Sequence, residues 1–210
     1  MMMKNFFSEN GMNVVKLYIN QIAMAVFGLM VVIFFAGGSE NELLILLASL
    51  LAVGLYLVII YSMMWDEGAR AASKTLRAED AGVSKIKTPF LIVLFGSMFN
   101  IVCFIAYTVL QIIVSTNNLT EGTAYDWGYL FSVIIRMTNA IYMGFESLLF
   151  RDTVVMRTPA YFFFITLIPL FVVGIFAYYL GASEISILRK LGFKTKHKST
   201  TRINYDKNKK

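Results

Sequence analysis

Five long runs of apolar residues dominate the chain, at residues 17–36, 43–64, 90–114, 129–150 and 160–180. Each run has about the 20 residues that a helix needs to cross the roughly 30 Å hydrocarbon core of a bilayer. No run shows the apolar–polar alternation of a barrel strand, and backbone groups in lipid must be satisfied within the protein. The pattern therefore predicts an all-α, polytopic integral membrane helix bundle over residues 1–193.

The composition agrees with this class. Hydrophobic residues make up 58% of the chain and charged residues 15%, whereas a globular domain has roughly 45–50% and about 25%. The mean hydropathy is +0.66. These values exclude soluble, collagenous, disordered and disulfide-rich secreted proteins. The single cysteine, Cys103, lies inside an apolar run, so an intrachain disulfide is impossible.

The first run could be read as a signal peptide, because Lys4 and Lys16 precede it. However, the run is long and begins with the polar pair Asn20 and Gln21. We therefore expect it to be retained as a membrane anchor.

The distribution of Lys and Arg predicts the orientation in the membrane. Lys4 and Lys16 precede the first run, and further basic residues lie in the 65–89 connection. The 37–42 and 115–128 connections contain none. The N-terminus and the 65–89 connection are therefore predicted to be cytoplasmic.

The C-terminal tail does not fit five simple crossings. From Gly181 onward it carries nine Lys and Arg against only Glu184 and Asp206. Five crossings would place this tail outside, and short tails of such positive charge are seldom exported. An even number of crossings returns the tail to the cytoplasm. The sequence thus predicts that one run does not cross as a simple helix and that both termini are cytoplasmic.

The fourth run, 129–150, differs from the others because it contains Arg136, Asn139 and Glu146. On an ideal helix these side chains share one side with Ser132 and Met143. Such a stripe is typical of an amphipathic helix in the interface or of a re-entrant segment. A spanning helix with its polar face turned into the bundle is the alternative, and it leaves the charge distribution unexplained.

Arg136 and Glu146 are ionisable at predicted membrane depth, where each costs about 2.5–3.5 kcal/mol. Ten residues correspond to about 15 Å along a continuous helix, so we expect no direct bridge between them. Each then needs a partner on another helix, and the uncharged candidates are Asn20, Gln21, Asn100 and Gln111. The set is interpreted either as a polar path for a solute or ion, or as an intramembrane clamp.

Motifs for catalysis are missing from the sequence. It contains no His-Glu-x-x-His, Gly-x-Ser-x-Gly, phosphate-binding glycine loop or Cys-x-x-Cys. The one histidine, His197, lies in the basic tail without a neighbouring His or Cys to complete a transition-metal site. We therefore predict a non-enzymatic protein with no catalytic residue, no cofactor and no metal.

Residues 194–210 form a polar, basic tail without a core-forming pattern. Such a tail is expected to be disordered and to be attracted to anionic lipid at the cytoplasmic leaflet. Because the tail lies beside a membrane, lipid contact is favoured over nucleic-acid binding.

Short segments near both ends and in the first long loop carry a resemblance. They are Tyr18-Ile19-Asn20-Gln21-Ile22-Ala23-Met24 with Phe27-Gly28-Leu29, then Tyr61-Ser62-Met63-Met64-Trp65-Asp66-Glu67-Gly68, and finally Tyr178-Tyr179-Leu180-Gly181. In these segments the chain resembles uncharacterised multipass membrane proteins of similar length from Gram-positive bacteria. The resemblance implies a bacterial cytoplasmic membrane and supplies no activity, substrate or site residue.

Together these patterns favour an accessory or partner subunit of the cell membrane, packed in the bilayer against another membrane protein or a second copy. The alternative function is a small transporter or channel whose polar path follows the fourth run. The candidate path or clamp residues are Arg136, Asn139, Glu146, Asn20, Gln21 and Asn100. Co-purification of a stoichiometric partner would favour the first function, and solute flux in liposomes would favour the second.

Overall fold

The computed structural model describes residues 2–36, 42–75, 86–117, 121–150 and 158–183, and all regular structure in these ranges is helical. The helices are α1 (Met2–Ala36), α2 (Glu42–Thr75), α3 (Lys87–Gly96), α4 (Met98–Thr116), α5 (Thr123–Thr138), the 3-10 helix η1 (Ala140–Tyr142), α6 (Met143–Leu149) and α7 (Ala160–Ala182). Length and composition make four of them able to cross a membrane, over Phe6–Val31, Glu42–Ala72, Met98–Thr116 and Ala160–Ala182. The prediction of an all-helical chain with membrane-length apolar helices is thereby confirmed.

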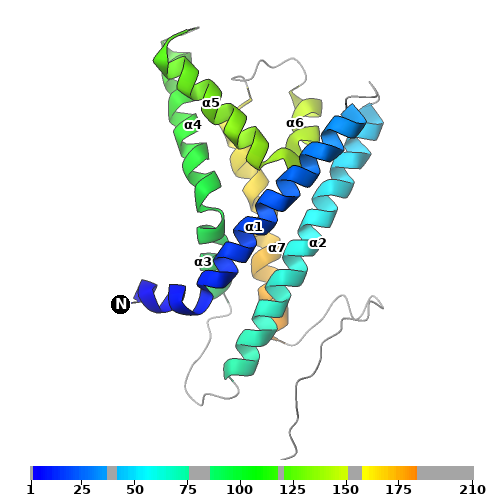
Figure 1. Cartoon of the computed structure of the whole chain (residues 1–210), viewed down its shortest axis with the longest axis vertical. Helices are drawn as coiled ribbons and strands as arrows, with labels where there is room; N and C mark the ends of the chain where they lie inside the picture. Colours follow the sequence, from blue (N-terminus) through cyan, green and yellow to red (C-terminus); the bar gives the residue numbers. More distant parts are fainter. Residues whose placement is uncertain (1, 37–41, 76–85, 118–120, 151–157, 184–210) are drawn as a thin grey trace, which may run out of the picture.

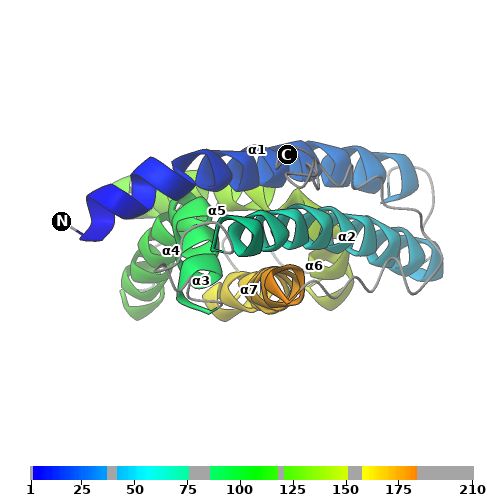
Figure 2. The same cartoon turned by 90° about the horizontal axis from the view of Figure 1, so that it is seen from below.

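The long helices alternate in direction between two ends of the bundle (Figure 1). In that view α1 rises toward the upper end, α2 descends, α3 and α4 rise, and α7 descends. Figure 2 shows α2 between α1 and α7, and the most extensive helix–helix packing is between α2 and α7. The start of α1 and the end of α7 consequently lie toward the same end of the bundle.

Two glycines allow α2 and α7 to touch backbone to backbone. A methyl group added at Gly68 of α2 would overlap the carbonyl oxygen of Tyr178, and one added at Gly181 of α7 would overlap the carbonyl oxygen of Trp65. Small residues at a crossing point are a common means of bringing membrane helices close together. The two helices are therefore fixed in register at their lower ends.

The predicted third run, 90–114, is divided into two helices at Ser97. Gly96 and Ser97 form a Gly–Ser pair, a frequent cause of helix kinks, and Leu17 of α1 packs into the space that a side chain at Gly96 would fill. Hydrogen bonds from Ser97 N to Val93 O and from Ile101 N to Ser97 O keep the two helices continuous across the kink. One predicted helix is therefore a bent pair.

The predicted fourth run, 129–150, is also interrupted, and here the chain changes direction. Helix α5 ends at Thr138. At this end the carbonyl oxygen of Ile135 accepts hydrogen bonds from the backbone and side-chain nitrogens of Asn139 and from the Thr138 hydroxyl. Asn and Thr side chains that bond nearby backbone in this way compete with helix continuation. The expectation of a single helix carrying Ser132, Arg136, Asn139, Met143 and Glu146 on one side is therefore wrong.

Large apolar side chains cover the outward faces of the long helices. Each of those named here is more than half exposed: Leu47, Leu50, Leu51, Val58, Val102, Ile105, Val109, Ile112, Ile165, Ile168, Val172 and Phe176. Exposed apolar surface of this extent marks contact with a membrane or with another protein. The predicted basic tail, 194–210, lies outside the described residues.

Candidate functional site

Residues 123–149 form a two-armed unit, which we call the hairpin. α5 descends from the upper end of the bundle to its middle, η1 turns the chain, and α6 rises again (Figure 1). The tip of the hairpin, residues 139–142, lies against α1 and α2 in the interior of the bundle, and Ala140, Ile141 and Tyr142 are buried. The break in the α-helix at 139–142 is thus surrounded by protein, as breaks in membrane helices generally are.

The two arms of the hairpin are joined by an ion pair, which we call the clasp. Arg136 Nε of α5 donates to Glu146 Oε1 of α6 at 2.8 Å, and the Arg136 and Glu146 side chains are 18% and 7% exposed. The expectation that these residues cannot bridge each other is wrong. It assumed a continuous helix, and the turn at 139–142 folds one residue back toward the other. Arg136 and Glu146 are therefore each other's partners.

Thr158, just before α7, completes the clasp. Its hydroxyl donates to Glu146 Oε1 at 2.7 Å and accepts from Arg136 Nη2 at 2.8 Å. Its carbonyl oxygen accepts from the Tyr107 hydroxyl at 2.9 Å and from Gln111 Nε2 at 3.1 Å. Thr158 is fully buried. The clasp therefore ties α4, both hairpin arms and the start of α7 into one hydrogen-bonded network.

Two small-residue contacts seat the tip of the hairpin. A methyl group at Gly28 of α1 would overlap backbone atoms of Ile141 and Ala140, and one at Gly144 of α6 would overlap the hydroxyl of Ser49 in α2. Because these contacts involve backbone or a short side chain, the neighbours have little freedom to move aside. Close packing at these glycines thus holds the tip in place, in addition to the clasp.

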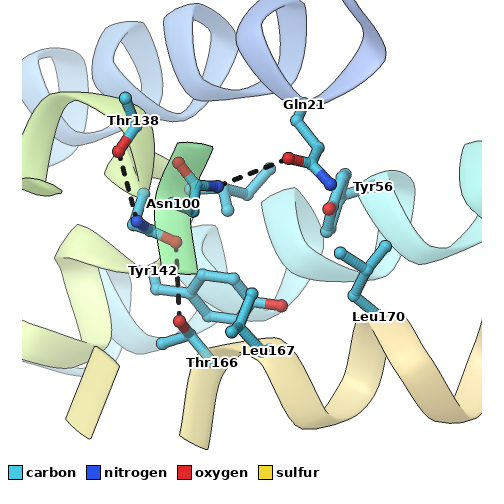
Figure 3. A pocket seen from close by; sticks show the side chains of 10 residues that line it. Gln21, Tyr56, Asn100, Thr138, Tyr142, Thr166, Leu167 and Leu170 are labelled. Atoms are coloured by element: carbon cyan, nitrogen blue, oxygen red, sulfur yellow. Dashed lines mark hydrogen bonds between the residues drawn. The ribbon is translucent and has the colours of Figure 1, made fainter. Parts of the chain in front are cut away.

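A small polar cavity, which we call the tip cavity, lies beside the turn. The centre of a water-sized particle has about 10 Å³ of free space there, roughly the room for one water molecule. Its polar lining comes from five parts of the chain and includes Gln21, Tyr56, Asn100, Asn139, Tyr142 and Thr166. Figure 3 shows Gln21 and Asn100 on one side and Thr166, Leu167 and Leu170 on the other.

Amide side chains around the tip cavity hydrogen-bond one another and their neighbours. Asn100 Nδ2 donates to Gln21 Oε1 at 3.3 Å, and Gln21 Nε2 donates to Ser97 Oγ at 3.0 Å. Asn139 Nδ2 donates to Ile135 O at 3.2 Å and to Thr138 Oγ1 at 3.3 Å. Gln21, Asn100 and Asn139, which the sequence singled out separately, therefore gather around one space.

Asn20 does not join them. Its Nδ2 donates to the sulfur of Met63 in α2 at 3.3 Å. Nearby, Glu67 Oε1 lies 3.6 Å from Lys16 Nζ and 3.0 Å from Arg70 Nη1. The contacts of Asn20 with Met63 and of Lys16 with Glu67 tie α1 to α2, so Asn20 has a packing role and does not line the cavity.

Sequence reasoning missed Thr158, Tyr107 and Tyr142. Thr158 precedes the fifth run and Tyr107 lies within the third, where single polar atoms give no pattern. Tyr142 gives no signal either, because an aromatic residue in an apolar run is ordinary. Of the predicted uncharged partners, Gln111 reaches the clasp, through its hydrogen bond to Thr158 O.

Comparison with protein-family models, with curated proteins and with solved structures gives no match to this chain. Among residues 2–36, 42–75, 86–117, 121–150 and 158–183, no group of three or more His, Cys, Asp or Glu is gathered that could hold a metal ion. The functional interpretation consequently rests on the clasp and the tip cavity.

Proposed function

We propose that the hairpin is a re-entrant segment of the membrane, entering and leaving at one face, while α1, α2, the α3–α4 pair and α7 cross. The first residues of α5 and the last of α6 both lie toward the upper end in Figure 1, which supports this arrangement. Four crossings also place the basic tail on the side of the N-terminus, as the distribution of Lys and Arg requires. That side is then the cytoplasm.

We further propose that the protein is a small transporter or channel. The observation that carries this proposal is the tip cavity. Polar side chains from all four proposed crossing helices meet there, beside a turn that interrupts a helix within the bundle. Interrupted helices at mid-membrane form the substrate and ion sites of many secondary transporters. Polar groups in a membrane interior are costly to bury, so their presence there points to a function.

With the clasp formed, the proposed transport path is in a closed conformation. Arg136 and Glu146 neutralise each other, and the tip cavity takes about one water-sized particle. This conformation is closed to larger solutes, so transport requires the clasp or the helices around it to move.

Reconstitution tests the transport proposal. Purified protein is placed in liposomes, and the flux of small inorganic ions and of protons is measured with internal dyes. We expect flux above that of empty liposomes, and we expect Asn139→Leu at the cavity and Glu146→Gln at the clasp to remove it. Glu121→Gln changes an exposed carboxylate and should leave flux unchanged. Absence of flux from correctly folded wild-type protein contradicts the proposal.

An accessory or partner subunit is the second candidate, and the pairing of Arg136 with Glu146 within the protein favours it. Buried polar groups whose hydrogen bonds are satisfied by one another often serve only to specify packing. In that case a membrane-protein partner should co-purify in a fixed ratio and flux should be absent. The two functions are thus separated by two measurements on the same preparation.

A further inference from the structure

The amide side chains around the tip cavity donate hydrogen bonds to protein acceptors. Gln21 Nε2 donates to Ser97, Asn100 Nδ2 to Gln21, and Asn139 Nδ2 to Ile135 and Thr138. Each amide has one nitrogen and one oxygen. Both N–H groups of Asn139 Nδ2 are used in this way, which leaves Asn139 Oδ1 as the free polar atom of that side chain, whereas Gln21 Oε1 already accepts from Asn100.

Two oxygens of the lining, one from Tyr142 and one from Asn139, lack a good donor within the described part of the chain. The Tyr142 hydroxyl is buried and has no hydrogen-bond partner. Asn139 Oδ1 has only the Thr166 hydroxyl, at 3.5 Å, and the single proton of that hydroxyl is directed to Phe163 O at 2.6 Å. A buried acceptor without a donor is costly, so the cavity calls for an occupant that supplies positive charge or donated protons.

The chemistry of the lining limits the kinds of ligand that the cavity can bind. The lining contains no Lys or Arg to balance an anion, and no carboxylate, the group that Mg²⁺ and Ca²⁺ sites generally use. It also contains no His or Cys for a transition metal. Space for about one water-sized particle excludes an organic solute. What fits is a monovalent inorganic cation that exchanges its hydration shell for neutral oxygens, as in some ion channels.

We propose that the tip cavity is a binding site for one dehydrated monovalent cation, with the Tyr142 hydroxyl and the side-chain oxygens of Gln21, Asn100 and Asn139 providing the polar surroundings. This inference deepens the proposed transport function by naming the class of ion, and it rests on the same cavity. Binding can nevertheless be measured without flux, so the two proposals can fail separately.

The thermal unfolding of the purified protein in detergent provides the first test. Unfolding is followed in LiCl, NaCl, KCl and choline chloride at equal ionic strength. A ligand that binds only the folded state stabilises it progressively above its Kd, so we expect at least one of the inorganic cations to raise the Tm by a few degrees over choline, in a saturable manner. Equal Tm values in all four salts would overturn the proposal and leave the cavity to a water molecule.

The Tyr142→Phe variant tests whether the stabilising cation binds in the tip cavity. The substitution keeps the ring and removes the oxygen, so the fold should persist. We expect the half-saturating cation concentration to rise roughly tenfold or more, the size of one lost contact between a hydroxyl and a charged group. Tyr129→Phe, at a position 47% exposed, is the matched control and should not change it. A cation effect that is the same in Tyr142→Phe and wild type would place the ion elsewhere and overturn the proposal.

Flux measurements then distinguish the proposed cation-binding site from the proposed transport function. Cation stabilisation that depends on Tyr142, without flux, keeps the binding site and removes the transport function. Flux without cation stabilisation keeps transport and removes this site.

Discussion

Arg136 and Glu146 face each other across an interrupted helix, with Nε and Oε1 2.8 Å apart although ten residues separate them in the chain. The interruption is what makes the pair possible, because ten residues of continuous helix would hold the two side chains about 15 Å apart. The turn that lies beside the tip cavity thus also brings together the two charges that were predicted to need separate partners.

A double-mutant cycle measures this pair. Glu146→Gln leaves the partly buried Arg136 beside an uncharged group, and removing one member of a buried ion pair costs about 3–5 kcal/mol. Arg136→Gln should be similarly destabilising. The double variant Arg136→Gln/Glu146→Gln should lose less stability than the two single changes combined, because no unpaired charge remains. Additive losses, measured by thermal unfolding in detergent, would show that the two side chains do not interact.

Gly28 should be intolerant of a side chain. Its missing Cβ admits the backbone of Ile141 at the tip of the hairpin, so Gly28→Ala must push α1 and the hairpin apart, at a cost of about 1–3 kcal/mol for overpacking. Gly54→Ala in α2 is the control, since no atom lies within 4 Å of the added methyl and Ala favours helix. The Tm should fall for Gly28→Ala and stay level or rise for Gly54→Ala.

The crossing of α2 and α7 makes a parallel prediction at the opposite end of the bundle. Gly68→Ala and Gly181→Ala each place a methyl group against a carbonyl oxygen of the facing helix, so both should lower the Tm. Gly11→Ala adds a methyl with nothing within 4 Å and serves as control. If Gly68→Ala and Gly181→Ala unfold at the wild-type temperature, α2 and α7 do not meet at these glycines.

The helical segments could be predicted from the sequence because length and apolarity alone determine which segments suit a bilayer. The chain direction at 139–142 could not, since it depends on Asn139 and Thr138 turning their side chains back to Ile135. The pattern of apolar residues does not reveal where side-chain hydrogen bonds to the backbone interrupt a helix. The pairing of Arg136 with Glu146 depends on that turn. The contact between Gln21 and Asn100 depends on how α1 packs against α3 and α4. Neither contact could therefore be predicted from the spacing of these residues in the sequence.

Tyr107 offers a smaller test of the network around the clasp. Tyr107→Phe removes the hydrogen bond from its hydroxyl to Thr158 O, which lies in the buried interior. The expected loss is about 1 kcal/mol in the free energy of unfolding. Tyr161→Phe, at a position 61% exposed on α7, should leave stability unchanged. An equal effect of the two substitutions would contradict a role for Tyr107 in holding Thr158.

The re-entrant course of the hairpin is tested most directly by cysteine accessibility. Cys103 is the only cysteine of the chain, so a Cys103→Ser background carries no other thiol. Single cysteines are introduced as Glu121→Cys before α5, Val155→Cys between α6 and α7, and Tyr205→Cys in the tail, and intact cells are treated with an impermeant thiol reagent. A re-entrant hairpin predicts labelling at positions 121 and 155, with position 205 labelled only after permeabilisation. Protection at position 155 together with labelling at position 205 in intact cells would mean five crossings and would contradict the re-entrant hairpin.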